Sequence, residues 1–173
     1  AASCFAFWPG FQNEFVNWDD EKIIVNNTNY RGLGWAELKW MFTTVYMCHY
    51  QPLGWFSYSV DYAIWGLNPR GFFLTNLLIH SATALCFYFL SRRLLQMVVT
   101  CSPGDAQIGA AIAAMFFAVH PLRVESVVWL SERRDVLSGF FFLLSVYCYL
   151  RFTESSERIR ARRAGRDGGR ARP

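Results

Sequence analysis

The stretch from Leu74 to Leu90 reads LTNLLIHSATALCFYFL and decides the fold. It carries no charged side chain, and it lies within a longer apolar run from residue 72 to residue 99. A helix needs about 20 mostly apolar residues to cross the hydrocarbon core of a bilayer. We therefore expect a membrane-spanning helix over 72–99, with the stems of Arg92 and Arg93 reaching back to the membrane surface.

Two further apolar runs follow. Residues 101–105 contain Pro and Gly and predict a turn. A second helix is expected over 108–130, kinked at Pro121 because proline lacks an amide hydrogen, and a third over 136–152. The sequence therefore predicts an all-α integral membrane fold with about three transmembrane helices.

The composition agrees with this fold class. Of the 173 residues, 53% are hydrophobic, 18% are aromatic and 17% are charged, whereas soluble domains carry about 25% charged residues. This composition excludes a disordered chain and a coiled coil. No nucleic acid is expected as a partner, because the arginines from residue 158 onward have no aromatic residues between them. Membrane lipid is the expected partner.

The distribution of charge predicts the orientation of the helices. Eight arginines and three acidic residues lie in 151–173, whereas 1–150 carry nine basic and ten acidic residues. The positive-inside rule places a disordered, Arg-rich tail over 153–173 in the cytoplasm, together with Arg92 and Arg93. Residues 1–71 and the connection 120–135 then lie on the extracytoplasmic side.

The extracytoplasmic segment 1–71 is rich in Trp and Tyr, which favour the level of the lipid headgroups. It is interrupted too often by Asn, Asp, Gly and Pro to span a membrane. We expect two short interfacial helices within it, over 35–44 and 53–67.

Asp19 and Asp20 form an acidic pair beside an aromatic, apolar stretch. Carboxylates that are close together in a water-poor setting hold protons more readily, which suits a general base. The alternative is structural, because Asp is also a favoured N-cap and a short segment begins at Glu21.

A second polar cluster lies in 120–135. If 122–134 is helical, Glu125 and Glu132 share one face. Arg133 and Arg134 are suited to hold a phosphate or pyrophosphate through charge-assisted hydrogen bonds. The alternative is a loop of mutual ion pairs among these charges.

His80 and Asn76 share a face of the first long helix. Polar residues inside a membrane helix usually face protein or a cavity, and a hydrogen bond between helices explains them equally well. The sequence has no Cys or His spacing typical of a metal site, so no metal-ligating residues and no cofactor are expected, and the sequence leaves dependence on a divalent metal open.

Several motifs occur in a recognisable order along residues 13–152. They are FVNWDD at 15–20, WMFT at 40–43, PLGWFS at 52–57, LTNLLIH at 74–80, HPLRVESVVW at 120–129 and SERRDVLS at 131–138. This pattern resembles the membrane domain of bacterial tetratricopeptide-repeat membrane proteins, which are related to the eukaryotic transmembrane-and-tetratricopeptide-repeat O-mannosyltransferases.

The resemblance implies a larger C-type glycosyltransferase bundle that moves a sugar from a polyprenyl-phosphate donor to a protein or other hydroxyl acceptor. The lipid-linked sugar is then a substrate, and the protein lies in the bacterial inner membrane, or in the endoplasmic reticulum membrane of a eukaryote. By this resemblance Asp19 and Asp20 supply the catalytic carboxylate. The candidate substrate-binding residues are His80, His120, Glu125, Glu132, Arg133 and Arg134.

The sequence departs from the family pattern at four positions. Family members often carry histidine where this chain has Gln51, Tyr58 and Phe73, and usually lysine at the position of Arg134. The first membrane helix, the later helices and the repeats are missing, so we expect a fragment that is inactive alone. An alternative function is a non-catalytic anchor or scaffold for tetratricopeptide repeats. A transporter fits less well, since no inverted repeat is visible.

Overall fold

The computed structural model describes the backbone of residues 2–100 and 102–170, with side chains to Ser156 and that of Ile159. Over these residues the chain is helical, with no strand beyond one bridge between Tyr46 and His49. The elements in chain order are α1 (Ala2–Ala6), η1 (Trp8–Gln12), η2 (Glu21–Val25), α2 (Trp35–Thr43), α3 (Pro52–Trp65), α4 (Pro69–Val98), α5 (Pro103–Val119), α6 (Arg123–Val128), η3 (Leu130–Glu132) and α7 (Arg133–Arg170).

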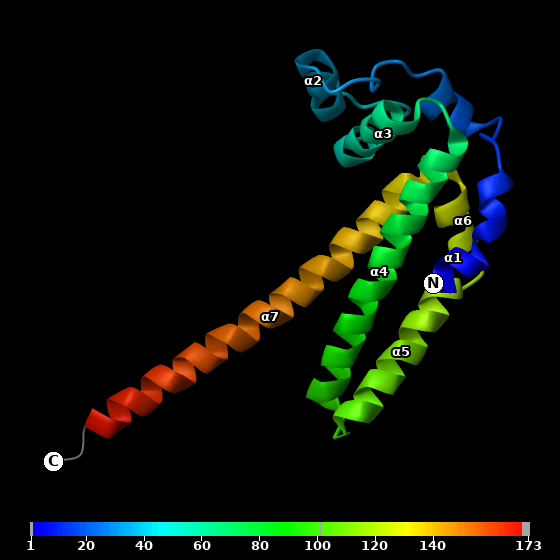
Figure 1. Ribbon diagram of the computed structural model, residues 1–173. Coiled ribbons are helices and arrows are strands. Elements are labelled where there is room, and N and C mark those ends of the chain that lie inside the picture. Colours follow the sequence, from blue (N-terminus) through cyan, green and yellow to red (C-terminus); the bar gives the residue numbers. More distant parts are fainter. Residues whose placement is uncertain (1, 101, 171–173) are drawn as a thin grey trace.

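Three long helices form the body of the structure, and α4 lies between α5 and α7 (Figure 1). At the start of α4 the Asn68 side chain accepts a hydrogen bond from the Arg70 amide at 3.1 Å. At the start of α5, Ser102 Oγ accepts from the Asp105 amide at 3.1 Å and the Asp105 carboxylate accepts from the Ser102 amide. These caps satisfy amides that have no partner inside the helix, and they explain why α5 begins earlier than expected.

Two helical stretches are long and apolar enough to cross a membrane, Pro69–Val98 and Leu130–Ser156. Only 33% of the most apolar part of the first and 6% of the second is buried inside the molecule. Large apolar side chains of α7 therefore point outward, as Phe142 does with 66% of its surface exposed. Such a surface is suited to lipid. The third span remains a prediction, because the 17 residues of α5 are at the lower limit of the length of a spanning helix, about 17–25 residues.

The continuous kinked helix expected over 108–130 is wrong. Helix α5 ends at Val119 and α6 begins only at Arg123. His120 before Pro121 has an extended backbone with ψ 132°, as the steric demand of a following proline requires. Since α6 ends at Val128, the helix expected over 122–134 does not form and no single helix places Glu125 and Glu132 on one face.

The C-terminal segment also differs from expectation. The backbone of α7 is helical to Arg170, whereas we expected the third helix to end at residue 152 and a disordered tail to follow. Arg, Ala and Glu, which recur in this segment, are strong helix formers, which explains the continuation. Residues 171–173 lie outside the described part of the chain.

The hydrophobic core lies at the end of the bundle where α3, α6 and the start of α7 meet α4 (Figure 1). The segment before α4 folds over this end, with α2 and α3 close to the two ranges expected for interfacial helices. Their position in the membrane interface remains a prediction. The buried apolar residues of this core are Phe7, Ile23, Ile24, Tyr30, Met41, Trp55, Tyr58, Phe72, Phe73, Leu77, Val127, Leu130 and Val136.

Candidate functional site

Asp20 links the two polar motifs of the sequence. Its side chain is fully buried. One carboxylate oxygen accepts a hydrogen bond from the Val16 amide at 3.0 Å, and the other accepts from the Ser131 amide at 2.8 Å. Ser131 is 111 residues away in sequence. The loop with Asp19 and Asp20 is therefore fixed directly to the segment that carries Glu132, Arg133 and Arg134.

Asp19 is in a different setting from its neighbour. It is half-buried, and among the described residues its carboxylate accepts no hydrogen bond. Asp20 by contrast has a backbone donor on each oxygen. Of the acidic pair, Asp19 is thus the member whose carboxylate is free to accept a proton from a substrate.

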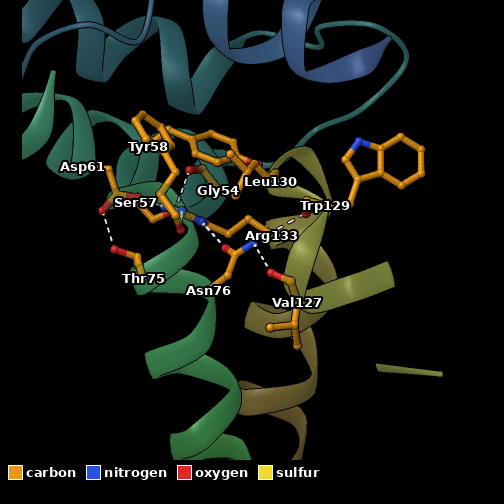
Figure 2. A network of polar contacts seen from close by, with 11 residues as sticks. Gly54, Ser57, Tyr58, Asp61, Thr75, Asn76, Val127, Trp129, Leu130 and Arg133 are labelled. Atoms are coloured by element: carbon orange, nitrogen blue, oxygen red, sulfur yellow. Dashed lines mark hydrogen bonds and ion pairs between the residues drawn. The ribbon is translucent and has the colours of Figure 1, made fainter. Parts of the chain in front are cut away.

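Arg133 lies at the centre of a buried polar network (Figure 2). Its Nε donates to Asn76 Oδ1 at 2.8 Å, and one terminal nitrogen donates to the Phe72 carbonyl at 2.7 Å. The other terminal nitrogen forms an ion pair with Asp61 and donates to Ser57 Oγ at 3.4 Å. A single guanidinium thus connects α3, α4 and the start of α7.

Further contacts complete the network in Figure 2. The Thr75 hydroxyl donates to the second Asp61 oxygen at 2.6 Å, and the Asn76 amide donates to the Val127 carbonyl at 3.2 Å. The guanidinium carbon of Arg133 lies 4.7 Å from the centre of the Tyr58 ring, whose hydroxyl donates to the Leu130 carbonyl. A charge buried this deeply needs such partners, because an unpaired one is very costly.

Burial also changes the acid–base behaviour of groups in this network. Burial raises the pKa of the Asp61 carboxyl above its ordinary value, although the Arg133 charge and the Thr75 hydroxyl act in the opposite direction. Burial likewise raises the pKa of the Tyr58 hydroxyl. The members of this network are buried, and Arg133 has its donors directed at protein groups rather than at a substrate.

Arg134 points elsewhere and remains half-buried. It donates to both oxygens of Glu132, at 2.6 and 3.3 Å. It also lines a hollow of about 240 Å³ between the start of α3 and α7. Leu137 and Phe141 form one apolar wall of this hollow, and the opposite wall includes Gln51. The side-chain oxygen of Gln51 is buried and has no hydrogen-bond partner in the described part of the chain.

The histidines are not brought into this group. His80 is buried, and its Nε2 lies 3.0 Å from the Ala118 carbonyl of α5, which makes it a contact between helices. His120 lines a separate hollow of about 330 Å³ beside Arg123, and Glu125 is exposed. Asn76 and His80 thus do share a face toward protein, as their spacing indicates, but each bonds a different partner.

Sequence analysis missed Asp61, Ser57 and Thr75 as functional side chains. The available signal was Asp61 itself, the one charged residue in an otherwise apolar or uncharged stretch from residue 40 to residue 69. Such a carboxylate needs a cationic partner. Within the described residues, no group of three or more His, Cys, Asp or Glu side chains is arranged to hold a metal ion.

Comparison with known proteins finds relatives that are named protein O-mannosyl-transferases. Mouse and human proteins named protein O-mannosyl-transferase TMTC2 are each 37% identical over 102 residues, which is 59% of this chain and 11% of theirs. Human protein O-mannosyl-transferase TMTC4 is 31% identical over 171 residues, covering 91% of this chain and 23% of its own length. The chain is related to the TMTC protein O-mannosyl-transferases.

Human protein O-mannosyl-transferase TMTC1 extends the comparison, being 31% identical over 161 residues, or 87% of this chain and 17% of its own length. This TMTC-related chain thus spans about a tenth to a quarter of the length of these curated relatives. No family model matches the chain, and no solved structure matches it.

Proposed function

We propose that this TMTC-related chain forms part of a membrane glycosyltransferase that moves a sugar, such as mannose, from a polyprenyl-phosphate donor to a hydroxyl group of a protein or other acceptor. One observation carries the proposal. The hydrogen bond from the Ser131 amide to Asp20 joins the acidic motif to the arginine motif across 111 residues of sequence. A transferase needs these two chemistries together, a base for the acceptor and a cation for the departing phosphate.

In this proposal Asp19 is the base, because its carboxylate has no hydrogen-bond donor among the described residues, whereas Asp20 has two. Asp19 takes the proton of the acceptor hydroxyl, and the oxygen attacks the anomeric carbon of the sugar. The bond from that carbon to the phosphate oxygen breaks, and polyprenyl phosphate leaves with the bonding electrons. Asp20 positions the loop.

Arg134 is the proposed partner of the donor phosphate. It lies at the polar end of the hollow between α3 and α7, whose wall continues into the apolar Leu137 and Phe141 of the membrane-spanning stretch. This gradient from charge to hydrocarbon matches an amphipathic lipid phosphate. Gln51 lines the same hollow, and its side-chain amide is the proposed contact for the donor sugar.

The other candidate site residues have different roles in the proposed mechanism. Glu132 holds the Arg134 guanidinium in place, and Arg133 acts by fixing α3, α4 and α7 together. His80 supports the packing of α4 on α5. His120 and Glu125 lie apart from this hollow and are available to an acceptor. The proposed location is the bacterial inner membrane, or the endoplasmic reticulum membrane of a eukaryote, with several membrane passes.

The test is sugar transfer from radiolabelled polyprenyl-phosphate sugars by membranes that contain the full-length protein. We expect Asp19→Asn to abolish transfer at an unchanged unfolding temperature. Asp20→Asn should lower both transfer and the unfolding temperature, because it removes an acceptor from a buried backbone amide. Full transfer by Asp19→Asn would rule out this mechanism. If no donor supports transfer by the unmodified protein, the anchor or scaffold becomes the better explanation.

A further inference from the structure

A second cluster of arginines lies far from Asp19 and Asp20, between α4 and α7. Arg92 and Arg93 of α4 face Arg151 of α7 around a hollow of about 170 Å³. The other residues that line it are Phe89, Gln96 and Tyr147. Unlike the other hollows described above, this one has a predominantly polar lining.

The position of this cluster along α7 indicates at which membrane surface it lies. Arg134 and Arg151 are separated by 17 residues of continuous helix, which corresponds to about 26 Å at 1.5 Å per residue. The hydrocarbon core of a bilayer is about 30 Å thick. The two arginines therefore lie near opposite membrane surfaces, and the cluster lies at the surface that the positive-inside rule assigns to the cytoplasm.

Among the described residues, the side chains around the cluster balance only part of its charge. Arg93 forms an ion pair with Glu154, so that one positive charge is compensated. Among the described residues, Arg92 Nε is buried and has no hydrogen-bond partner, and Arg151 is exposed. Of the described residues, none that lines the hollow is acidic. Two arginines that line the hollow, Arg92 and Arg151, thus have no acidic partner among the described residues, and an anion in the hollow would balance their charge.

We propose that this hollow binds the phosphate headgroup of an anionic lipid from the cytoplasmic leaflet. Arg92 and Arg151 supply charge-assisted hydrogen bonds from two helices, and arginine matches the geometry of phosphate oxygens. Basic pockets between transmembrane helices on the cytoplasmic side are suited to such headgroups.

The lining favours a lipid over a soluble phosphate. Phe89 is 42% exposed on the apolar surface of α4, and its ring centre lies 6.5 Å from that of Tyr147 on α7. These rings form an apolar edge next to the arginines, where the glycerol and first acyl carbons of a bound lipid would lie. A free phosphate has no group for this edge. The proposal does not depend on the glycosyltransferase mechanism above.

The test uses the full-length protein in zwitterionic micelles, titrated with phosphatidylglycerol. Lipid binding is followed by native mass spectrometry and by the rise in unfolding temperature. We expect the double variant Arg92→Gln/Arg151→Gln to bind at least ten-fold more weakly. Arg162→Gln/Arg163→Gln removes the same charge from the tail and should bind as the unmodified protein does. Without anionic lipid, both variants should keep the unmodified unfolding temperature.

Each other outcome would overturn the proposal. Equal weakening by both double variants would mean general attraction between basic residues and the anionic surface. Competition by glycerol phosphate at the same concentration as the lipid would mean a site for a soluble anion. If Arg92→Gln/Arg151→Gln unfolds too readily to test, Arg92→Lys/Arg151→Lys retains the charge but not the planar donor pattern. Unchanged lipid binding by the lysine variant would then overturn the assignment.

Discussion

Replacing Arg133 with methionine should severely destabilise the protein. Asp61 is only 2% exposed, and after the change the Thr75 hydroxyl is the remaining side-chain partner of its carboxylate. It also removes the donors to Asn76 and to the Phe72 carbonyl. Breaking a buried pair by removing one member costs about 3–5 kcal/mol. We expect a loss of at least about 3 kcal/mol in the free energy of unfolding, since the unmade hydrogen bonds add to the unpaired charge.

A second substitution separates the cost of the unpaired charge from the loss of packing. In Arg133→Met/Asp61→Leu both charges are gone and the space is filled by apolar atoms. Replacing a buried ion pair with apolar residues of similar volume is often close to neutral. The double variant should therefore be more stable than Arg133→Met alone, with an interaction energy of about 2 kcal/mol in the double-mutant cycle.

The assay is equilibrium unfolding of the full-length protein in mixed micelles, followed by tryptophan fluorescence. Trp55 is fully buried and packs against Tyr58, so its emission reports on the same core. Arg133→Lys is the matched control: it keeps the charge near Asp61 but cannot make the other contacts, and it should lie between the two extremes. A loss below about 1 kcal/mol in Arg133→Met, the range of an exposed ion pair, would refute the reasoning.

Four smaller predictions follow from the backbone and from burial. An added Cβ at Gly71 would lie 2.7 Å from Trp65 Cβ, so Gly71→Ala should cost about 1–3 kcal/mol through overpacking. Gly139→Ala, where the nearest atom is 3.9 Å away, should instead stabilise α7 by up to about 1 kcal/mol in the same unfolding assay. Cys48 is exposed and has a φ of +65°, a left-handed conformation that is strained for any residue except glycine. Cys48→Gly should therefore raise the free energy of unfolding by about 1 kcal/mol, and a decrease would show that the backbone is not strained there. Burial raises the pKa of Tyr30 to about 12 from 10. The stability that the protonated Tyr30 hydroxyl contributes should therefore be fully present below pH 10 and be lost as the pH rises to 12. The free energy of unfolding of Tyr30→Phe should depend less on pH over that interval.

The long helices could be predicted from the sequence because their signals are local. Apolar runs at 72–99 and 136–152 correspond to the helices that begin at Pro69 and Arg133. The wrong prediction of one kinked helix over 108–130 also has a local cause. A kink was expected at Pro121, but proline at this point ends α5, since His120 has an extended conformation and the chain needs a turn before α6.

The buried network could not be predicted, because its members are far apart in sequence. Arg133 bonds Asp61 and Asn76 across 72 and 57 residues, and no periodicity encodes which of several arginines becomes buried. Sequence analysis assigned Arg133 and Arg134 the same phosphate-binding role. Packing separates them: Arg133 lies inside the protein, whereas Arg134 lines a hollow.

This separation changes how a loss of activity at Arg133 is to be interpreted. Ser131, which holds Asp20, is two residues before Arg133, so the network that fixes Arg133 also fixes the amide that orients the acidic loop. A variant of Arg133 should therefore lose transfer activity because the loop is displaced. Compared with Arg133→Met, Arg133→Lys should then recover part of the transfer and part of the stability together, while Arg134→Gln should lower transfer at unchanged stability. An Arg133 variant that kept full stability yet lost transfer would instead point to a direct contact with substrate.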